Sequence, residues 1–215
     1  ISSSLQYEFI RGTSTSVNNS FDFSDATNAY TELDQEFSND FNFNTTRHGA
    51  NLAFSYRSDL IEANFTNNFR NDIMYQVNNY EDLDLERNFL TYNPSLQFRY
   101  KLTKSKSVNF RFSRNNNLPS LTQIQPLRQN TDQLNIVVGN ENLRPSQSNN
   151  YNLSYNTYNM LKDAYGYLSL NWSQRFNNIQ QNIQIDNGRR TLSYANLDQV
   201  ANTVGLWSSF GKMIV

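Results

Sequence analysis

The sequence has 215 residues and a formal net charge of -1, which leaves no electrostatic case for binding nucleic acid or an anionic surface. Only 37% of the residues are hydrophobic and the mean hydropathy is -0.72, yet 14% are aromatic. Disordered chains are poor in aromatic residues, so the polarity of this chain does not indicate disorder. The absence of cysteine excludes disulfides and thiolate metal sites.

Strands rather than helices have to carry any membrane-spanning part, because no run approaches the 18 apolar residues of a transmembrane helix. A transmembrane strand needs only about 9 to 11 residues with alternate positions apolar, so low hydropathy is compatible with a membrane protein. The N-terminal residues Ile1-Ser2-Ser3-Ser4 lack the charged and apolar regions of a signal peptide, and we expect none in this sequence.

The N-terminal third predicts extended strands. Apolar and polar residues alternate from Leu5 to Phe9, and residues 12–34 then predict a long polar loop. Residues 52–66 alternate on both sides of a short polar segment, which predicts a hairpin. The apolar positions of its second strand continue to Val77, so this strand should project beyond the bilayer.

The rest of the chain repeats the same plan. Residues 92–113 and 151–173 each predict a hairpin, and residues 116–147 between them predict a long polar loop. Asp186-Asn187-Gly188 is a strong tight-turn signal, typical of a type I′ turn, and leads into a predicted strand over residues 190–210. Eight strands can be counted, and short turns alternate with long loops as in outer-membrane barrels.

The apolar face of these strands is aromatic, which favours a membrane barrel over a soluble sandwich. Sandwich interiors are usually rich in Val, Ile and Leu, whereas Tyr and Phe dominate here. Tyr92, Tyr100, Tyr151 and Tyr155 lie near predicted strand ends and suit an aromatic girdle at the lipid boundary. The fold class expected is therefore all-β, an antiparallel transmembrane β-barrel whose eight strands form either a small closed barrel or a sector of a larger one.

Residues 111–150 contain two motifs in a defined order. Leu118-Pro119-Ser120 follows a predicted strand, and Gly139-Asn140-Glu141-Asn142-Leu143-Arg144-Pro145 leads into the next. Together they resemble the "xxPS" and "GNPNLKPE" segments of TonB-dependent receptors, in particular the outer membrane protein beta-barrel family. Glu141 stands where that family often has Pro, and Ser146 stands where it often has Glu.

A third segment, Tyr194-Ala195-Asn196-Leu197 followed by Gly205, is similar to the "YxN…G" strand of the same family. The resemblance covers roughly residues 86–210. It implies a 22-stranded barrel, a plug domain in the lumen and a segment that contacts TonB, and neither a plug nor such a segment is seen in residues 1–215. We therefore expect the whole chain to be an internal section of a receptor barrel in the outer membrane of a Gram-negative cell, without an aromatic C-terminal residue.

Catalytic chemistry has little support in the sequence, so we expect no enzyme, no cofactor and no metal site. The single histidine, His48, is expected to be solvated or to face the lumen. A dense acidic run could coordinate a hard cation, although a solvated loop explains it better; it consists of Glu81, Asp82, Asp84 and Glu86.

Two sets of residues are candidates for function in such a barrel. Cationic side chains on the polar face could line the lumen, where they would contact a plug or guide an anionic solute: Arg99, Lys101, Arg111 and Arg175. The loop at residues 116–147 is the best candidate for solute or plug contact, through Pro119, Gln123, Arg128, Asn140 and Arg144.

The leading interpretation is a section of the barrel wall of a TonB-dependent nutrient receptor, with membrane lipid, the plug of the same protein, TonB and an unidentified solute as partners. One alternative is a free-standing eight-stranded outer-membrane barrel with a structural or adhesive role. Another is a soluble β-sandwich that acts as a binding module.

Overall fold

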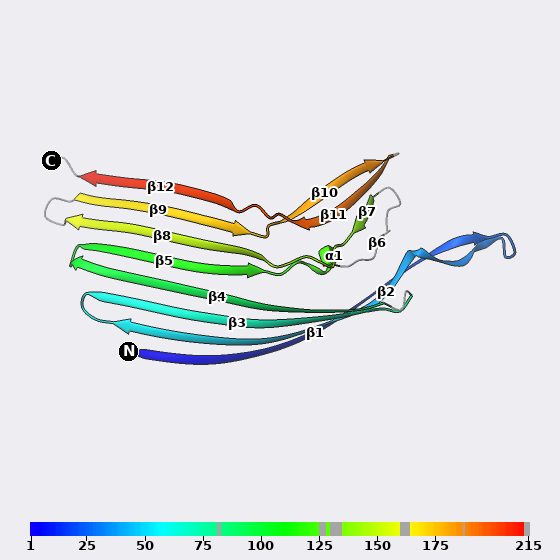
Figure 1. Cartoon of the computed structure of the whole chain (residues 1–215), viewed down its shortest axis with the longest axis horizontal. Coiled ribbons are helices and arrows are strands. Elements are labelled where there is room, and N and C mark those ends of the chain that lie inside the picture. The colour runs from blue at the N-terminus through cyan, green and yellow to red at the C-terminus, as the bar shows by residue number, and fades with distance from the viewer. Residues whose placement is uncertain (81–82, 125–127, 130–134, 160–163, 187, 213–215) are drawn as a thin grey trace.

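The chain forms one long, curved sheet and a smaller second sheet at one end of it (Figure 1). The computed structural model describes residues 1–80, 83–124, 128–129, 135–159, 164–186 and 188–212. Its elements are β1 (Ser2–Ser24), β2 (Ala29–Arg57), β3 (Ile61–Asn78), β4 (Leu83–Thr103), β5 (Lys106–Asn117), α1 (Leu121–Ile124), β6 (Arg128–Gln129), β7 (Asn135–Val138), β8 (Ser146–Asn159), β9 (Ala164–Phe176), β10 (Ile179–Asp186), β11 (Arg189–Asn196) and β12 (Ala201–Lys212). Among the described residues no helix is long and apolar enough to cross a membrane.

The large sheet confirms the all-β antiparallel prediction and its strand count. Its eight strands follow the order β1-β2-β3-β4-β5-β8-β9-β12, and every neighbouring pair is antiparallel. The three predicted hairpins are the pairs β2–β3, β4–β5 and β8–β9. The described residues pair β1 only with β2 and β12 only with β9, so the sheet is open, as in a sector of a larger barrel and unlike a closed eight-stranded barrel.

A single layer replaces the two packed layers of a sandwich. Four side chains that a sandwich would bury together are not buried: Phe98 and Leu170 are 37% and 44% exposed, and Leu96 and Phe110 are half-buried. Each lies on the same face of the large sheet, since Leu96 pairs with Phe112 while Phe98 pairs with Phe110. Exposed apolar rings on one face of an open sheet are those of a wall that meets lipid, not of a soluble core.

Two predictions about the course of the chain are wrong. Residues 12–34, expected to be a loop, belong to β1 and β2, and only residues 25–28 form the turn between them. This part of the two strands is rich in Ser, Thr and Asn but also exposes apolar side chains such as Phe21, Phe23 and Tyr30, and it is held by ladder bonds and by side-chain pairs such as Thr13–Asn44 at 2.9 Å. The expected single strand over residues 190–210 is two strands, β11 and β12, with a break at residues 197–200.

The tight turn between β10 and β11 agrees with the sequence. Asp186 pairs with Arg189, which leaves a two-residue connection, and Gly188 has a φ of 80°. Glycine adopts this left-handed conformation without steric cost, so the position suits it. Asn187, the remaining residue of that connection, lies outside the described residues.

The large sheet is divided at Pro94. Along one edge, β4 is paired with β3 as far as Leu83. Along its other edge, the ladder with β5 ends at the pair Ser95↔Ser113. Proline has no N–H to donate to a ladder and is therefore typical of such interruptions. Above this point the Asn116 side chain spans the gap, because its Nδ2 donates to the Tyr92 carbonyl oxygen at 3.0 Å. We call this gap the Pro94 seam.

Candidate functional site: the polar face of the sheet and the loop body

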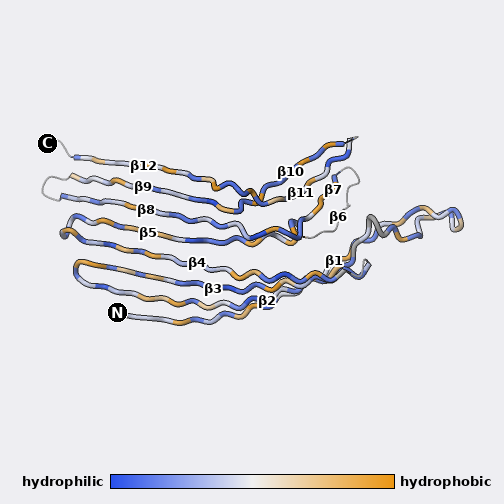
Figure 2. Tube along the Cα trace, in the orientation of Figure 1, coloured by the Kyte–Doolittle hydropathy of each residue, from blue (hydrophilic) through white to orange (hydrophobic). Residues whose placement is uncertain are grey.

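Hydrophobic segments recur along the strands of the large sheet (Figure 2), and the register gathers their side chains into a band on one face, the apolar face. Register aligns them into rows, one of which runs Tyr56, Ala63, Phe98, Phe110, Leu153, Leu170 and Leu206. On β4 the band extends over the eleven residues from Leu90 to Tyr100, which span about 33 Å along the strand and about 25 Å at a tilt of about 40°. That height matches the apolar band of an outer-membrane barrel.

The four predicted girdle tyrosines all lie on this apolar band. Tyr100 and Tyr155 flank Val108 in the row nearest the short turns. Tyr151 lies between two rings in a higher row, with centroid distances of 5.0 Å to Phe112 and 4.9 Å to Trp172. Tyr92 is stacked on Phe69 at 4.7 Å. Tyr100, Tyr155 and Tyr92 therefore lie toward the two margins of the band, whereas Tyr151 lies in one of its middle rows.

Above the band the same face becomes polar. Beside Tyr75 the row consists of Thr13, Asn44 and Glu86, and the Tyr75 hydroxyl donates to Asp84 at 2.9 Å. This bond stabilises the protonated phenol and raises the pKa of Tyr75. Glu81 and Asp82 of the acidic run lie outside the described residues. The described residues contain no group of three or more side chains that could hold a metal ion.

His48 also lies on the apolar face, at the upper margin of the band. It is exposed, its Nδ1 is 2.7 Å from the Tyr7 hydroxyl, and the Phe9 ring centroid is 5.2 Å away. It is therefore in contact with girdle-type aromatic residues and does not face the lumen side of the sheet.

The opposite face, the polar face, is strongly basic. Side chains that face each other across an antiparallel ladder lie on the same side of the sheet, so the register assigns every charged residue to a face. From the turns up to the pair Val17↔Asp40, the polar face carries eight cations against three carboxylates, an excess of five positive charges. The cations are Arg47, Arg57, Arg70, Arg87, Arg99, Lys101, Arg111 and Arg175, and the carboxylates are Glu8, Glu62 and Asp72.

The predicted lining residues Arg99, Lys101, Arg111 and Arg175 all belong to this set. Arg99 and Lys101 gather around Glu62 near the turns, and Arg111 lies in the next row, opposite Gln97. Glu62 was not among the predicted site residues. Lys101 Nζ is 2.8 Å from Glu62 Oε1, and Arg99 Nη1 is 4.0 Å from Oε2. Arg175 lies apart, opposite Ser148 on β8.

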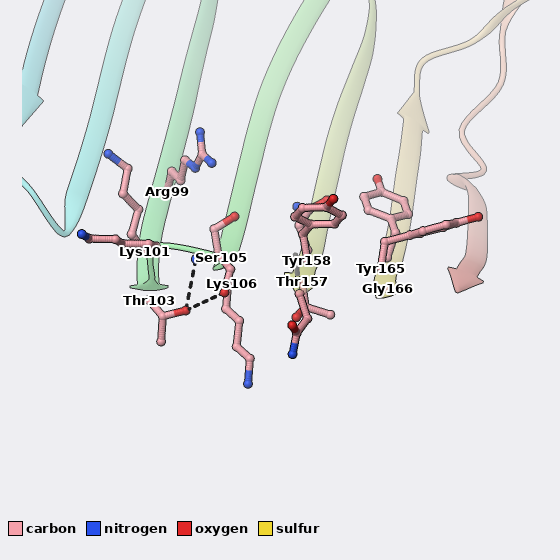
Figure 3. Close-up of a pocket in the computed structure, with 14 residues that line it drawn as sticks. Arg99, Lys101, Thr103, Ser105, Lys106, Thr157, Tyr158, Tyr165 and Gly166 are labelled. Atoms are coloured by element: carbon pink, nitrogen blue, oxygen red, sulfur yellow. Dashed lines mark hydrogen bonds between the residues drawn. The ribbon is translucent and has the colours of Figure 1, made fainter. Parts of the chain in front are cut away.

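Two of the hollows on the polar face meet at Arg99. The larger, of 790 Å³, lies at the turns and is lined by Lys101, Lys104 and three tyrosines. Figure 3 shows Tyr158 and Tyr165 side by side there, on β8 and β9. The smaller, of 210 Å³, lies above it between β3, β4 and β5.

A second cluster of charge lies higher on the polar face and was missed from the sequence. Asp72 is 5% exposed, and its carboxylate is 2.5 Å from Arg47 Nε and 3.7 Å from Arg70 Nε. Arg87, two pairs further up β4 on the same face, lies 3.7 Å from Glu141 Oε2. Only the register of β2, β3 and β4 brings these residues together, so their spacing in the sequence gave no signal.

The second sheet has the order β10-β11-β7-β6 and, with α1 and residues 139–145, forms what we call the loop body. The β11–β7 pair is parallel, and the other two are antiparallel. Ile124, Ile136 and Leu143 are 1%, 4% and 3% exposed, so the loop body has buried apolar side chains of its own. The predicted long loop at residues 116–147 is therefore largely structured where it is described.

The family-like motifs hold the loop body together. Asn140 Nδ2 donates to the Tyr194 carbonyl oxygen at 2.9 Å, and its Oδ1 accepts from the Asn142 N–H at 2.9 Å. Asn196 Oδ1 accepts from the Arg144 N–H at 2.8 Å, while its Nδ2 donates to the carbonyl oxygens of Arg144 at 2.9 Å and Asn177 at 2.8 Å. Two motifs far apart in the sequence thus satisfy each other's backbone groups.

The five predicted loop residues divide into buried and exposed positions. Pro119 is fully buried, and Gln123 accepts from the Ser120 N–H at 2.9 Å. Arg144 is exposed and lies 3.4 Å from Asp198. Arg128 belongs to β6, but its side chain lies outside the described part. A direct role of these residues in recognition stays a prediction.

The sequence matches the outer membrane protein beta-barrel family over residues 2–209. Similar solved structures include the siderophore receptor PirA from Pseudomonas aeruginosa (15% identity, 95% of this chain and 47% of that chain, TM-score 0.53) and the copper transporter OprC (10%, 99% and 33%, 0.63). Another is a double mutant of the Serratia marcescens hemophore receptor HasR in complex with its hemophore HasA and heme (12%, 81% and 32%, 0.58). No curated protein matches the sequence.

These identities show a common fold, and the chain spans from about a third to about half of each of these receptors and transporters. Their barrels agree with the open sheet, the apolar band and the polar face described above. The protein is located in the cell outer membrane, as the family and these structures indicate. The chain belongs to the outer membrane protein beta-barrel family, and it forms part of a barrel wall of the TonB-dependent receptor type.

Proposed function

We propose that the protein of which this wall is part imports a nutrient across the outer membrane, using energy delivered through TonB. The observation that carries the proposal is the contrast between the two faces of one sheet. A band of aromatic and aliphatic side chains covers one face at membrane height, where the single arginine by register, Arg114, is bonded to Asn149, and a polar face with five excess positive charges lies directly behind it. Such a wall separates lipid from a polar lumen.

The proposal includes a plug domain of the same protein that fills this lumen, an unidentified solute, and TonB as the energy-coupling partner. Siderophore, copper and hemophore receptors among the similar structures support a nutrient as the cargo. The loop body, which is anchored by Asn140 and Asn196, is the proposed contact for the solute or plug. An excess of cations on the wall is compatible with an anionic cargo.

Gene deletion tests the transport role. Strains that lack this gene, TonB, or both would be compared for uptake of radiolabelled metal chelates, heme and oligosaccharides. We expect the uptake of one cargo to be lost equally in all three strains and restored by the full-length gene. Uptake that is lost without the receptor but persists without TonB would contradict an energised mechanism.

The loop body is tested separately by deleting residues 122–134 in the full-length protein. If it contacts the cargo or plug, uptake should fall although the protein still reaches the outer membrane in normal amount. Unchanged uptake would remove this segment from the recognition site while leaving the transport proposal intact.

A further inference from the structure

The smaller hollow on the polar face has a regular lining of charged and amide side chains. Two consecutive rows of the sheet supply it: Glu62 pairs with Arg99, which pairs with Asn109, and Asn64 pairs with Gln97, which pairs with Arg111. These six residues enclose a volume of 210 Å³ together with parts of Phe98 and Phe110. The site is built from three adjacent strands of one rigid ladder, so its geometry does not depend on a loop.

Glu62, the only carboxylate among the residues that line this hollow, is already paired with cations. Glu62 accepts the close contact from Lys101 at 2.8 Å and is also approached by Arg57 at 3.7 Å. Arg99 is its most distant partner, at 4.0 Å, and remains half exposed with 49% of its side-chain surface accessible. The hollow therefore has more positive charge around it than Glu62 can neutralise.

Arg111 is the least satisfied cation of the group. It is exposed and, among the described residues, takes part in no ion pair or hydrogen bond. Its row is next to that of Arg99, so the two residues are diagonal neighbours on adjacent strands, with Cα atoms about 7 to 8 Å apart. Two long guanidinium side chains at that separation can converge on a single group between them.

We propose that this hollow binds a carboxylate, held by Arg99 and Arg111 with the amides of Asn64, Gln97 and Asn109 around it. The guanidinium fork matches the two oxygens of a carboxylate, and the amides can donate to the same oxygens. The carboxylate can belong to a solute in the lumen or to an acidic side chain of the part of the protein that fills it. This inference rests on the proposed position of the polar face toward a lumen.

The test is a crystal structure of the full-length receptor soaked in sodium bromide, with bromide located by its anomalous scattering. We expect either a bromide ion between Arg99 and Arg111, which identifies a site open to solute, or an Asp or Glu side chain of the protein within hydrogen-bond distance of both. In an R111Q variant the bromide should be absent, or its occupancy should be at least tenfold lower. The positions of the strands should be the same as in the unmodified receptor.

Arg175 provides the matched control, because it is an exposed arginine on the same face, outside the hollow, with no ion pair among the described residues. R175Q should leave the bromide at the hollow unchanged. A hollow without bromide or carboxylate, or bromide that occupies Arg175 as strongly as Arg111, would overturn the proposal. Neither result depends on uptake, so the transport role is judged independently.

Discussion

The two halves of the sheet have the same apolar band but differ above it. In the N-terminal half β1 to β4 are 18 to 29 residues long, and β2 alone spans about 95 Å as a continuous strand. In the C-terminal half β5, β8, β9 and β12 have 12 to 14 residues, and the chain then leaves the sheet for the loop body. Pro94 lies where the halves separate.

The difference shows two ways to satisfy backbone groups outside the membrane. The N-terminal half continues the ladder, so its backbone groups stay paired with each other and do not depend on the type of side chain. In the C-terminal half the ladder ends, and a few side-chain amides, mainly those of Asn140 and Asn196, bind the backbone groups of the loop body. Above the band, the stabilising hydrogen bonds are therefore spread along whole strands in the N-terminal half, whereas in the C-terminal half they depend on a few side chains.

The largest expected effect comes from a charge in the shared band. F65R in the full-length protein should cost about 2–4 kcal/mol of unfolding free energy, because Phe65 is in the middle of the band beside Phe54 and Leu96. V77R, on the same face of β3 but above the band and opposite Asp84, should cost at most about 1 kcal/mol. Denaturant titration in lipid vesicles measures both, and equal costs would contradict the assigned membrane height.

The second effect concerns the concentrated stability of the C-terminal half. N196A removes one acceptor and two donated bonds to Arg144 and Asn177, which should destabilise the loop body by about 1–3 kcal/mol. Amide hydrogen exchange should accelerate in β7 and β11 and stay unchanged in β2 and β3. N182A, at an exposed position of β10, is the control, and equal exchange in the two variants would refute the role of Asn196.

A smaller effect is expected at the Pro94 seam. N116A removes the bond from Nδ2 to the Tyr92 carbonyl oxygen but leaves the backbone N–H of residue 116 bonded to Asn93 Oδ1 at 2.7 Å. The cost should be about 1 kcal/mol and confined to the upper ends of β4 and β5. Exchange of the amide hydrogens of residues 91–93 and 115–117 would report it; a change spread over all of β4 would mean that the seam is not a local feature.

The smallest effect is expected for E141Q. The Arg87–Glu141 pair is 3.7 Å apart and half of the Glu141 side chain is exposed, so its loss should lower stability by less than about 1 kcal/mol. Thermal unfolding at low and high salt measures this difference, which should shrink as salt screens the pair. A cost that does not depend on salt would indicate a contact other than this ion pair.

The hairpins could be predicted from the sequence because alternation is enforced where one face meets lipid. Tyr92 to Lys101 and Val108 to Ser113 keep the strict period that the band requires, and their strands appear as expected. Above the band that requirement ends. The polar residues 12–34 then look like a loop although they are paired, since polar alternation carries no signal of pairing.

The site could be predicted only in part, for a similar reason. Arg99, Lys101 and Arg111 were recognisable as polar-face residues from alternation alone, but their relation to Glu62 depends on the register between β3 and β4. The motifs around Asn140 and Asn196 were visible separately. Their mutual bonds depend on the parallel pairing of β7 with β11, which local sequence patterns do not encode.

The Pro94 seam also affects how the two halves can move. Between the upper ends of β4 and β5, the described residues form no backbone ladder bond. The side-chain contacts described there are those of Asn116 with Tyr92 and Asn93 and the Arg87–Glu141 pair, and β6 of the loop body lies close to β2. Tilting the loop body outward would therefore break a few side-chain contacts and leave both ladders whole. Pro94 lies two rows below Leu90 on the apolar face, so the separation of the two halves begins within the band and not at its upper edge.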